Sequence, residues 1–336
     1  MAGRPLLEVE DLVKHFPLRD GALGRLLPGR RRVVHAVDGV SFTVAAGETL
    51  GLVGESGCGK TTTGRLVLRA IDPTSGRIRF AGEDITRLAG RALLPFRRQA
   101  QIVFQDPYAS LNPRMTVGRM VGEPMLVHGL VGRAEVGERV GALLETVGLL
   151  PEHARRFPHE LSGGQRQRVG IARALAVGPR LVVADEAVSA LDVSVRAQIL
   201  NLLVDLRERL GLAYLFVSHD LGVIRFVSHR VAVMYLGRLA EVAPTDVLFK
   251  RPLHPYTHAL MAAIPTVGDG AASIFDEPGR LIEGELPSPI DLPRGCRFKS
   301  RCPYRFAPCE DVEPALAPIE AGHAVACHLH AQGGTP

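Results

Sequence analysis

Tryptophan is absent from this sequence of 336 residues, and aromatic residues make up only 5% of it. Aliphatic side chains must therefore fill the core. Hydrophobic residues account for 46% of the chain and charged residues for 22%, which excludes a disordered composition. The length predicts either one large domain with an appendage or two modest domains.

Long apolar runs are missing as well. No stretch of roughly 18 or more apolar residues occurs, so we expect no transmembrane helix. The first residues, MAGRPLLEVEDLVKHF, carry acidic side chains early and lack the apolar centre of a signal peptide. We therefore expect a cytoplasmic protein that reaches a membrane only through a partner. The net charge of +5 is compatible with nucleic acid, an anionic membrane face or nucleotide phosphates, and does not choose among them.

Apolar periodicity predicts strands that alternate with helices. We expect strands at 6–16 (as a sheet edge), 33–44 (as a strand pair), 48–53, 77–80, 100–104, 181–184 and 213–218, then a hairpin centred on Gly237. We expect helices from 59 or 60 to about 70, in a block from about 107 to 177, and at 194–211, with a surface loop at 19–32. This alternation indicates an α/β fold with a largely parallel sheet and an inserted helical subdomain.

Residues 54–61 read GESGCGKT and match the pattern G-x-x-x-x-G-K-[ST] between an expected strand and an expected helix. Glycines let backbone N–H groups converge on phosphates, and the helix start adds positive potential. Lys60 is expected to reach the β- and γ-phosphates, Thr61 to hold Mg²⁺ and Thr62 to bond a phosphate oxygen. The expected ATP-binding residues of this loop are Gly54, Glu55, Ser56, Gly57, Cys58, Gly59, Lys60, Thr61 and Thr62. Cys58 is expected to be structural, not catalytic.

Two acidic residues end the apolar run at 181–184. Asp185 and Glu186 follow it directly, at the carboxyl end of an expected buried strand, where ligands bind in open α/β sheets. Two adjacent acids alone are usually a solvated strand end. Beside a phosphate loop, Asp185 is expected to hold hydrated Mg²⁺ and Glu186 to act as the general base that polarises the attacking water.

The motif LSGGQ at 161–165, together with the phosphate loop, resembles the nucleotide-binding subunits of ABC transporters. This resemblance implies a P-loop NTPase (RecA-like) core with a parallel sheet, an antiparallel β edge subdomain and the inserted helical subdomain. The motif can present hydroxyl and backbone N–H donors at a helix start. In the family it faces the γ-phosphate of ATP bound to a second subunit, so that two ATPs are sandwiched and hydrolysis drives the membrane domains. The implied ATP-binding residues are Ser162, Gly163, Gly164 and Gln165.

Further positions match the family's motifs. Gln105 resembles the glutamine that senses Mg²⁺, water and the membrane partner. Asp192, in SALD, resembles the D-loop residue at the dimer interface, and His219, in FVSHD, the switch histidine at the γ-phosphate. Phe16 stands where the family places an adenine-stacking aromatic, although a lone phenylalanine in a strand is more often core. The family often has proline after the catalytic glutamate, and Ala187 departs from this pattern; hydrolysis is still expected.

Three segments resemble the oligopeptide/dipeptide importer branch, and within it slightly favour the dipeptide F-type ATPase. They are QDPYASLNPRMTVG (105–118), LFKRPLHPYTHALMAAIP (248–265) and a tail with CRFKSRCP and VACH. The implied domains are a nucleotide-binding domain at 1–245, with its helical subdomain at about 107–177, and an importer-type extension at 246–336. The implied partners are a second related ATPase in a heterodimer, two membrane permeases and an extracytoplasmic substrate-binding protein. The implied location is the cytoplasmic face of the membrane.

Cysteines are few, five in all, and four of them crowd the tail. Their spacing is C-x5-C-x6-C-x17-C, without the short pairs of zinc fingers, whereas iron–sulfur sites accept longer spacing. Resemblance to the importer tail implies a [4Fe–4S] cluster on Cys296, Cys302, Cys309 and Cys327. Unligated thiols, or a zinc site joined by His323, His328 or His330, are the alternatives.

Related importers carry nickel, heme precursors or sugars, and the cassette itself does not contact cargo. An ABC ATPase acting on nucleic acid is a different class, but this chain carries one set of motifs and has no long insertion between Gln105 and Leu161. We therefore expect no direct nucleic-acid partner. A P-loop kinase or GTPase is disfavoured by LSGGQ.

Overall fold

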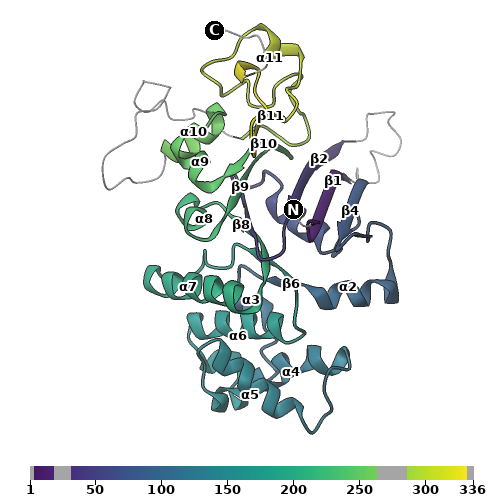
Figure 1. Cartoon of the computed structure of the whole chain (residues 1–336), viewed down its shortest axis with the longest axis vertical. Coiled ribbons are helices and arrows are strands. Elements are labelled where there is room, and N and C mark those ends of the chain that lie inside the picture. The colour runs from purple at the N-terminus through teal and green to yellow at the C-terminus, as the bar shows by residue number, and fades with distance from the viewer. Residues whose placement is uncertain (1–3, 19–31, 263–285, 331–336) are drawn as a thin grey trace, which may run out of the picture. The chain divides into compact units, whose positions relative to one another are not determined.

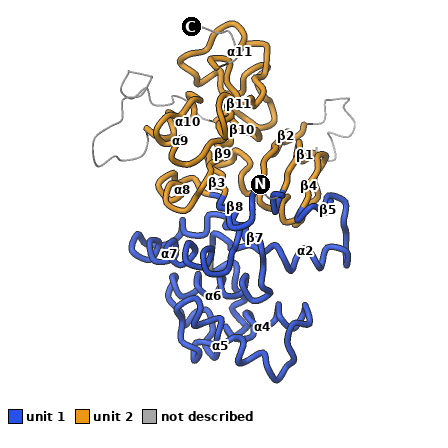
Figure 2. Tube along the Cα trace, viewed as in Figure 1, with its two compact units in different colours: residues 1–7, 44–49, 80–217 blue, residues 8–43, 50–79, 218–336 orange. Residues whose placement is uncertain are grey.

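The computed structural model describes residues 4–18, 32–262 and 286–330. The loop expected at 19–32 lies outside these residues except at its end, as do parts of the extension expected at 246–336. The chain divides into two compact units (Figure 2), with unit 1 made of 1–7, 44–49 and 80–217 and unit 2 of 8–43, 50–79 and 218–336. No helix within the described residues has the length and apolar character needed to span a membrane.

Unit 1 is built on a parallel sheet with the strand order β8-β7-β6. The three strands of this sheet are β6 (Ala100–Val103), β7 (Leu181–Asp185) and β8 (Ala213–Ser218). The unit also contains the short strand β5 (Glu83–Asp84), which is not part of this sheet. Its helices are η2 (Gly90–Leu93), α2 (Leu94–Gln99), α3 (Pro107–Ser110), α4 (Val117–Val127), α5 (Val136–Thr146), η3 (Pro151–Arg155), η4 (Pro158–Glu160), α6 (Gly163–Leu175) and α7 (Val193–Leu210). Every residue of β7 is buried, and β7 has a parallel strand on each side, so the expected central parallel strand is confirmed.

The helices α4, α5 and α6 pack against one another and form the helical block of unit 1 (Figure 1). Buried apolar residues recur at helical spacing, such as Val117 and Val121 in α4 and Val140 and Leu144 in α5. The helix expected at 194–211 is α7, and it ends at Gly211, whose φ of 65° suits a left-handed C-terminal cap. The helical prediction for this part of the chain is confirmed.

Unit 2 contains a second run of strands in the order β11-β12-β10-β9-β3. Its elements are β1 (Leu7–Pro17), β2 (Val33–Val44), β3 (Thr49–Val53), α1 (Lys60–Val67), β4 (Ser75–Phe80), α8 (Leu221–Val227), β9 (Arg230–Tyr235), β10 (Arg238–Pro244), α9 (Thr245–Lys250), α10 (Pro255–Ala262), α11 (Ala307–Asp311), β11 (Ala317–Glu320), β12 (His323–Val325) and η5 (His328–His330). β3 runs parallel to β9, and β10 lies antiparallel between β9 and β12. The expected hairpin is confirmed, with Leu236 and Gly237 at φ 41° and 80° in its turn.

Two expectations for the N-terminal strands are wrong. β1 was expected at a sheet edge but lies between β2 and β4. The segment 33–44 was expected to form a strand pair, but it is the single strand β2. The dipeptide Asp38-Gly39 has the composition of a hairpin turn, yet the strand continues through it, with Gly39 absorbing a φ of 84°.

Candidate active site

The phosphate loop of unit 2 runs from the end of β3 to the start of α1. Gly54 has a φ of 153°, and a Cβ there would lie 2.1 Å from the carbonyl oxygen of Met234. Gly59 has a φ of 111°, and its Cβ would lie 2.1 Å from the carbonyl oxygen of Ala36. Both positions require glycine because the loop passes close to neighbouring backbone. Gly59 is also the residue before α1, so no side chain there caps the helix amides, which leaves them available to an anion.

Lys60 lies over this loop and not in solvent. Its ammonium donates hydrogen bonds to the carbonyl oxygens of Gly54, at 2.7 Å, and Glu55, at 2.9 Å. The residue is only 4% exposed. Cys58 beneath it is buried, and burial raises the pKa of its thiol, so it stays protonated at neutral pH. A buried ammonium at a helix start whose first amides have no side-chain cap is suited to binding phosphate.

Two residues from far along the chain brace this loop, and sequence reasoning missed both roles. The hydroxyl of Tyr256 accepts a hydrogen bond from the Glu55 N–H at 2.8 Å. Arg301 donates to both carboxylate oxygens of Glu55, at 2.9 and 3.0 Å, and its side chain is 7% exposed. Tyr256 belongs to the segment HPYT and Arg301 to the cysteine-rich tail, so two segments far along the chain contact the phosphate loop.

Replacing Arg301 with methionine is expected to raise the KM for ATP by about 3- to 10-fold with little change in kcat. The reason is that Glu55 loses its partner and the loop loses a brace worth about 1 kcal/mol, since Glu55 is partly solvated. Steady-state ATPase kinetics measure both constants. Arg305→Met, at an exposed position in the same tail, is the control and should leave KM unchanged. An unchanged KM in the Arg301 variant would show that the contact has no role in nucleotide binding.

The buried carboxylate of Glu241 in β10 holds the segment that carries Tyr256. It accepts hydrogen bonds from the backbone N–H groups of Leu253 and His254 and from Nε2 of His323, at 2.7, 2.9 and 2.7 Å. Burial opposes the carboxylate, but these donors outweigh it and lower the pKa of Glu241. His254 Nδ1 in turn accepts the N–H of Tyr256 at 3.0 Å. These bonds position Tyr256 against the phosphate loop.

The stability of the protein is expected to fall as the pH drops from about 6.5 to 4, and His254 contributes to this loss. Burial lowers the pKa of His254 from 6.5 to about 4. Between these pH values His254 binds a proton in the unfolded chain but not in the folded chain. The contribution of neutral His254 to the free energy of unfolding is therefore complete above pH 6.5 and is lost toward pH 4. The difference corresponds to about 3 kcal/mol.

Urea unfolding at pH 7 and pH 4.5 measures this effect. His254→Asn keeps an acceptor for the Tyr256 N–H and removes the titrating group, so the stability difference between the two pH values should shrink. His159→Asn, at an exposed histidine, should retain the wild-type difference. Equal pH dependence in the wild type and the His254 variant would contradict the assignment.

In unit 1, the acidic end of β7 has a strained backbone. Asp185 is the last residue of the strand and is 8% exposed. Glu186 follows with a φ of 48°, which is uncommon for a residue with a side chain and costs about 1–3 kcal/mol. Its N–H donates to the carbonyl oxygen of Val217 at 2.9 Å, and the N–H and hydroxyl of Ser189 donate to its carbonyl oxygen. These bonds hold the strained turn. Ala187 follows Glu186, so the turn forms here without a proline at that position.

Gln105 and Glu186, both expected to be catalytic, meet in this unit. Gln105 follows β6, which pairs in parallel with β7, so the two strand ends lie at the same sheet edge. Nε2 of Gln105 donates a hydrogen bond to Oε2 of Glu186 at 2.9 Å. The amide of Gln105 therefore orients the carboxylate of Glu186.

The LSGGQ segment starts helix α6 of unit 1. Ser162 is the N-cap: its hydroxyl accepts the N–H of Gln165 at 3.3 Å, and Oε1 of Gln165 accepts the N–H of Ser162 at 3.0 Å. A Cβ on Gly164 would lie 2.5 Å from Cγ1 of Val195 in α7, so this glycine allows close helix contact. Gly163 is the first helical residue. The expected helix start with exposed donors is therefore present.

The remaining expected residues lie on several elements. Phe16, in β1, is 38% exposed, with the Lys14 ammonium 5.0 Å from its ring centre, so it is not a core residue. Asp192 precedes α7 and is exposed. His219 is exposed and follows β8. Thr61 and Thr62 lie in the first turn of α1 and are partly exposed.

The four tail cysteines gather in unit 2. Cys296 and Cys309 are buried, and the N–H of Cys296 donates to the carbonyl oxygen of Cys309 at 2.9 Å. Burial raises the pKa of Cys302 to about 11 and of Cys327 to about 12, and the neighbouring thiols add to both shifts. Backbone N–H groups next to these sulfurs act in the opposite direction. The thiols are therefore close enough that the negative charge of one thiolate disfavours ionisation of the next.

The tail histidines have partners of their own. His323 binds Glu241 in the core, and Nε2 of His328 and of His330 lies 2.8 and 2.9 Å from the carbonyl oxygens of Val312 and Leu253. None of these contacts directs a ring nitrogen at a thiol. This arrangement does not favour the zinc site joined by histidine.

Known proteins resemble this chain along almost all of its length. Residues 37–189 match the ABC transporter family, and residues 240–309 match the C-terminal region of oligopeptide/dipeptide transporters. The chain is 54% identical over 326 residues to the "Probable peptide ABC transporter ATP-binding protein y4tS" of Sinorhizobium fredii, covering 97% of this chain and 90% of that one. It is 49% identical to the oligopeptide transport ATP-binding protein AppF of Bacillus subtilis, covering 97% of both.

Solved structures support the same conclusion. The ATP-binding cassette MJ0796, in a post-hydrolysis dimer bound to ADP and Pi, is 28% identical and superimposes with a TM-score of 0.62, covering 71% of this chain and 98% of that one. The chain is an ATPase that belongs to the family of oligopeptide/dipeptide ABC transporter ATP-binding proteins.

Proposed function

We propose that this chain hydrolyses ATP to drive the import of dipeptides or oligopeptides through a membrane complex. The observation that carries the peptide assignment is the match of residues 240–309 to the oligopeptide/dipeptide transporter region. The structure adds that residues of this region, Tyr256 and Arg301, hold the phosphate loop. A region typical of peptide transporters thus contacts the loop that we propose to bind phosphate.

The proposed nucleotide site assigns a role to each of the motif residues. Phe16 stacks on adenine, and the loop from Gly54 to Thr62 binds the phosphates, with Lys60 at the β- and γ-phosphates. Thr61, Asp185 and Gln105 would hold Mg²⁺, whose charge neutralises the phosphates when it is bound. The oxygen donors of this set suit a hard cation, and the extended loop amides with the buried Lys60 suit the polyphosphate.

Hydrolysis is proposed to depend on Glu186 as the general base. Its carboxylate accepts the proton of the attacking water, while the Gln105 amide keeps that carboxylate oriented at 2.9 Å. His219 contacts the γ-phosphate, and Asp192 lies at the dimer interface. The residues Ser162 to Gln165 act on the ATP of a second subunit, because helix-start donors suit a phosphate.

The proposed assembly follows from the family. A second, related ATPase completes a heterodimer, two permeases receive the motion, and an extracytoplasmic binding protein delivers the peptide. The chain works at the cytoplasmic face of the membrane, as a peripheral subunit. We propose residues 1–245 as the nucleotide-binding domain, with the helical subdomain at about 107–177, and residues 246–336 as the extension.

The four tail cysteines are proposed to hold a [4Fe–4S] cluster. A single tetrahedral zinc ion would place its sulfur ligands about 3.8 Å apart. No three of these thiols lie within 4.8 Å of one another, although all four are among the described residues. Backbone N–H groups that hydrogen-bond Cys296, Cys302 and Cys327 would tune the sulfurs of a cluster. The cluster would supply a wide cationic core that relieves repulsion among the four thiolates.

Anaerobic purification tests the cluster. The protein should be brown and contain bound iron, and Cys302→Ser should lose most of both. Cys58→Ser, which changes the cysteine outside the tail, should keep them. A preparation with neither visible absorption nor iron would exclude the cluster, and bound zinc would favour the zinc alternative.

The peptide assignment is tested by partner capture and ATPase stimulation. The chain should be retained by its permeases, and its ATPase activity should rise when these are present with a peptide-loaded binding protein. Nickel, heme precursors and sugars with their own binding proteins should not stimulate it. ATPase activity that ignores permeases but rises with DNA or ribosomes would overturn the proposal in favour of the nucleic-acid class.

A further inference from the structure

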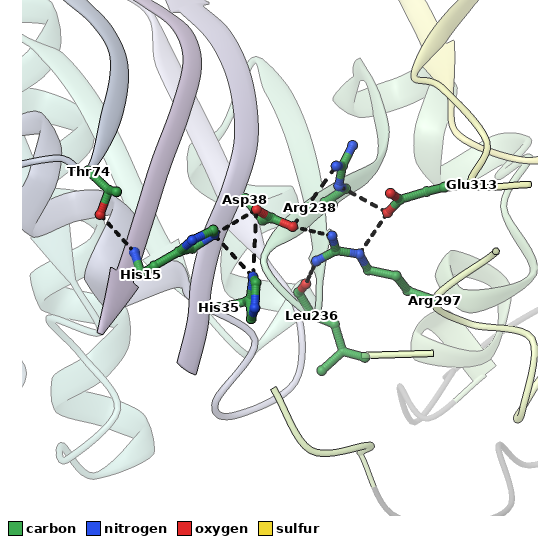
Figure 3. A network of polar contacts seen from close by, with 8 residues as sticks. All are labelled: His15, His35, Asp38, Thr74, Leu236, Arg238, Arg297 and Glu313. Carbon is green, nitrogen blue, oxygen red and sulfur yellow. Dashed lines mark hydrogen bonds and ion pairs between the residues drawn. The ribbon is translucent and has the colours of Figure 1, made fainter. Parts of the chain in front are cut away.

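A cluster of two histidines and an aspartate lies on β1 and β2 of unit 2, outside the phosphate loop (Figure 3). Nε2 of His15 lies 2.8 Å from Oδ1 of Asp38 and 3.1 Å from Nδ1 of His35, and Nδ1 of His35 lies 3.9 Å from the same Oδ1. A metal ion needs several ligand atoms close together. Among the His, Cys, Asp and Glu residues that the structure describes, these three bring their ligand atoms within 4.8 Å of one another, and no other three do.

The contacts of His15 cannot both be good hydrogen bonds. A ring nitrogen carries at most one hydrogen. If Nε2 of His15 donates to Asp38, the same hydrogen cannot also point along the contact to His35. If His35 donates to Nε2 instead, the lone pair of His15 faces the carboxylate at 2.8 Å. A positive ion between the three atoms satisfies all of them at once, whereas a proton satisfies only one pair.

We propose that His15, His35 and Asp38 bind one divalent transition-metal ion of the borderline class that includes Zn²⁺ and Co²⁺. Imidazole and carboxylate are ligands of that class. Bonds of about 2.1 Å place ligand atoms about 3.0 Å apart in octahedral geometry and about 3.4 Å apart in tetrahedral geometry. The three observed separations, from 2.8 to 3.9 Å, span these values. The two imidazoles are 27% and 30% exposed, so water can complete the coordination.

Ion pairs on the other oxygen of Asp38 orient its carboxylate. Oδ2 of Asp38 binds the guanidinium of Arg297 and lies 4.0 Å from that of Arg238, which leaves Oδ1 directed at the histidines. Glu313 binds both arginines, at 2.7 and 3.0 Å. The Glu313 carboxylate offsets one of these two guanidinium charges, and the Asp38 carboxylate faces the other through Oδ2. Such second-layer partners typically orient metal ligands.

The backbone of His15 is fixed by its N–H bond to the hydroxyl of Thr74, at 3.0 Å.

Co²⁺ titration of the full-length protein without nucleotide tests this site. Co²⁺ bound to nitrogen and oxygen gives weak visible bands, whereas Co²⁺ on the tail thiolates adds intense charge-transfer absorption. In the wild type we expect a nitrogen–oxygen site, and His35→Gln and His15→Gln should each weaken it by at least about 10-fold while the thiolate absorption is unchanged. His159→Gln, which changes an exposed histidine, should behave as the wild type.

Calorimetry with Zn²⁺ gives an independent reading. The wild type should bind one more ion than His35→Gln, with circular dichroism melts confirming that both proteins are folded. The same number of ions bound with the same affinities in the wild type and both histidine variants would overturn the proposal. In the Co²⁺ titration, histidine variants that lose thiolate absorption but keep the weak bands unchanged would overturn it as well, because the histidines would then not be ligands of the nitrogen–oxygen site.

Discussion

Replacing Glu186 with glutamine is expected to lower the ATP turnover number by at least about 100-fold while ATP binding persists. The change keeps the shape of the side chain and removes the carboxylate that would take the proton of the attacking water. The φ of 48° and the bonds to Val217 and Ser189 are backbone features that do not depend on the carboxylate. The contact with Gln105 can persist as an amide–amide bond, so the turn should stay folded.

The same variant should accumulate a dimer of nucleotide-binding subunits that holds ATP. Light scattering after size-exclusion chromatography with ATP and Mg²⁺, together with ATP turnover, gives both readings. Glu138→Gln, at an exposed position of α5 in the same unit, is the matched control and should turn over ATP normally. Normal turnover in the Glu186 variant would refute its assignment as the base.

Replacing Lys60 with alanine is expected to weaken ATP binding by about 100-fold or more. Two charge-assisted hydrogen bonds to phosphate oxygens are worth about 3 kcal/mol or more together. Lys60 reaches the loop from a site that is 4% exposed and already bonds two loop carbonyls, so its ammonium is positioned before nucleotide arrives. Its removal therefore takes away both the charge and part of the loop's own support.

Fluorescent nucleotide titration measures this affinity directly. Lys250→Ala, at an exposed lysine at the end of α9, should bind nucleotide as the wild type does. Melting temperatures of both variants separate a loss of binding from a loss of fold. An unchanged affinity in the Lys60 variant would refute the phosphate-loop assignment.

The parts of the fold set by neighbouring residues could be predicted from the sequence. The phosphate loop follows from glycines at fixed spacing, because Gly54 and Gly59 have no room for a Cβ. The capped helix start at Ser162 follows from a residue pair three positions apart. The central strand β7 follows from an uninterrupted apolar run. In each case the physical cause lies within a few residues of the feature.

Contacts between distant segments could not be predicted in the same way. Tyr256 and Arg301 bind Glu55, although they lie about 200 to 250 residues further along the chain. The spacing of apolar residues in the sequence gives no information about such pairs. The position of β1 between two strands depends on pairing partners, which its own alternation does not name. Asp38-Gly39 carries a hairpin signal that the pairing of the rest of β2 overrides.

Peptide import driven by ATP hydrolysis is tested most directly by measuring both processes in one proteoliposome. The chain, its partner ATPase, the permeases and the binding protein are reconstituted together, and labelled peptide uptake is recorded beside phosphate release. Uptake should require ATP, both rates should rise with peptide, and Glu186→Gln should abolish uptake and phosphate release together. Peptide uptake that continues in the Glu186 variant, or phosphate release that peptide never changes, would contradict the proposed function.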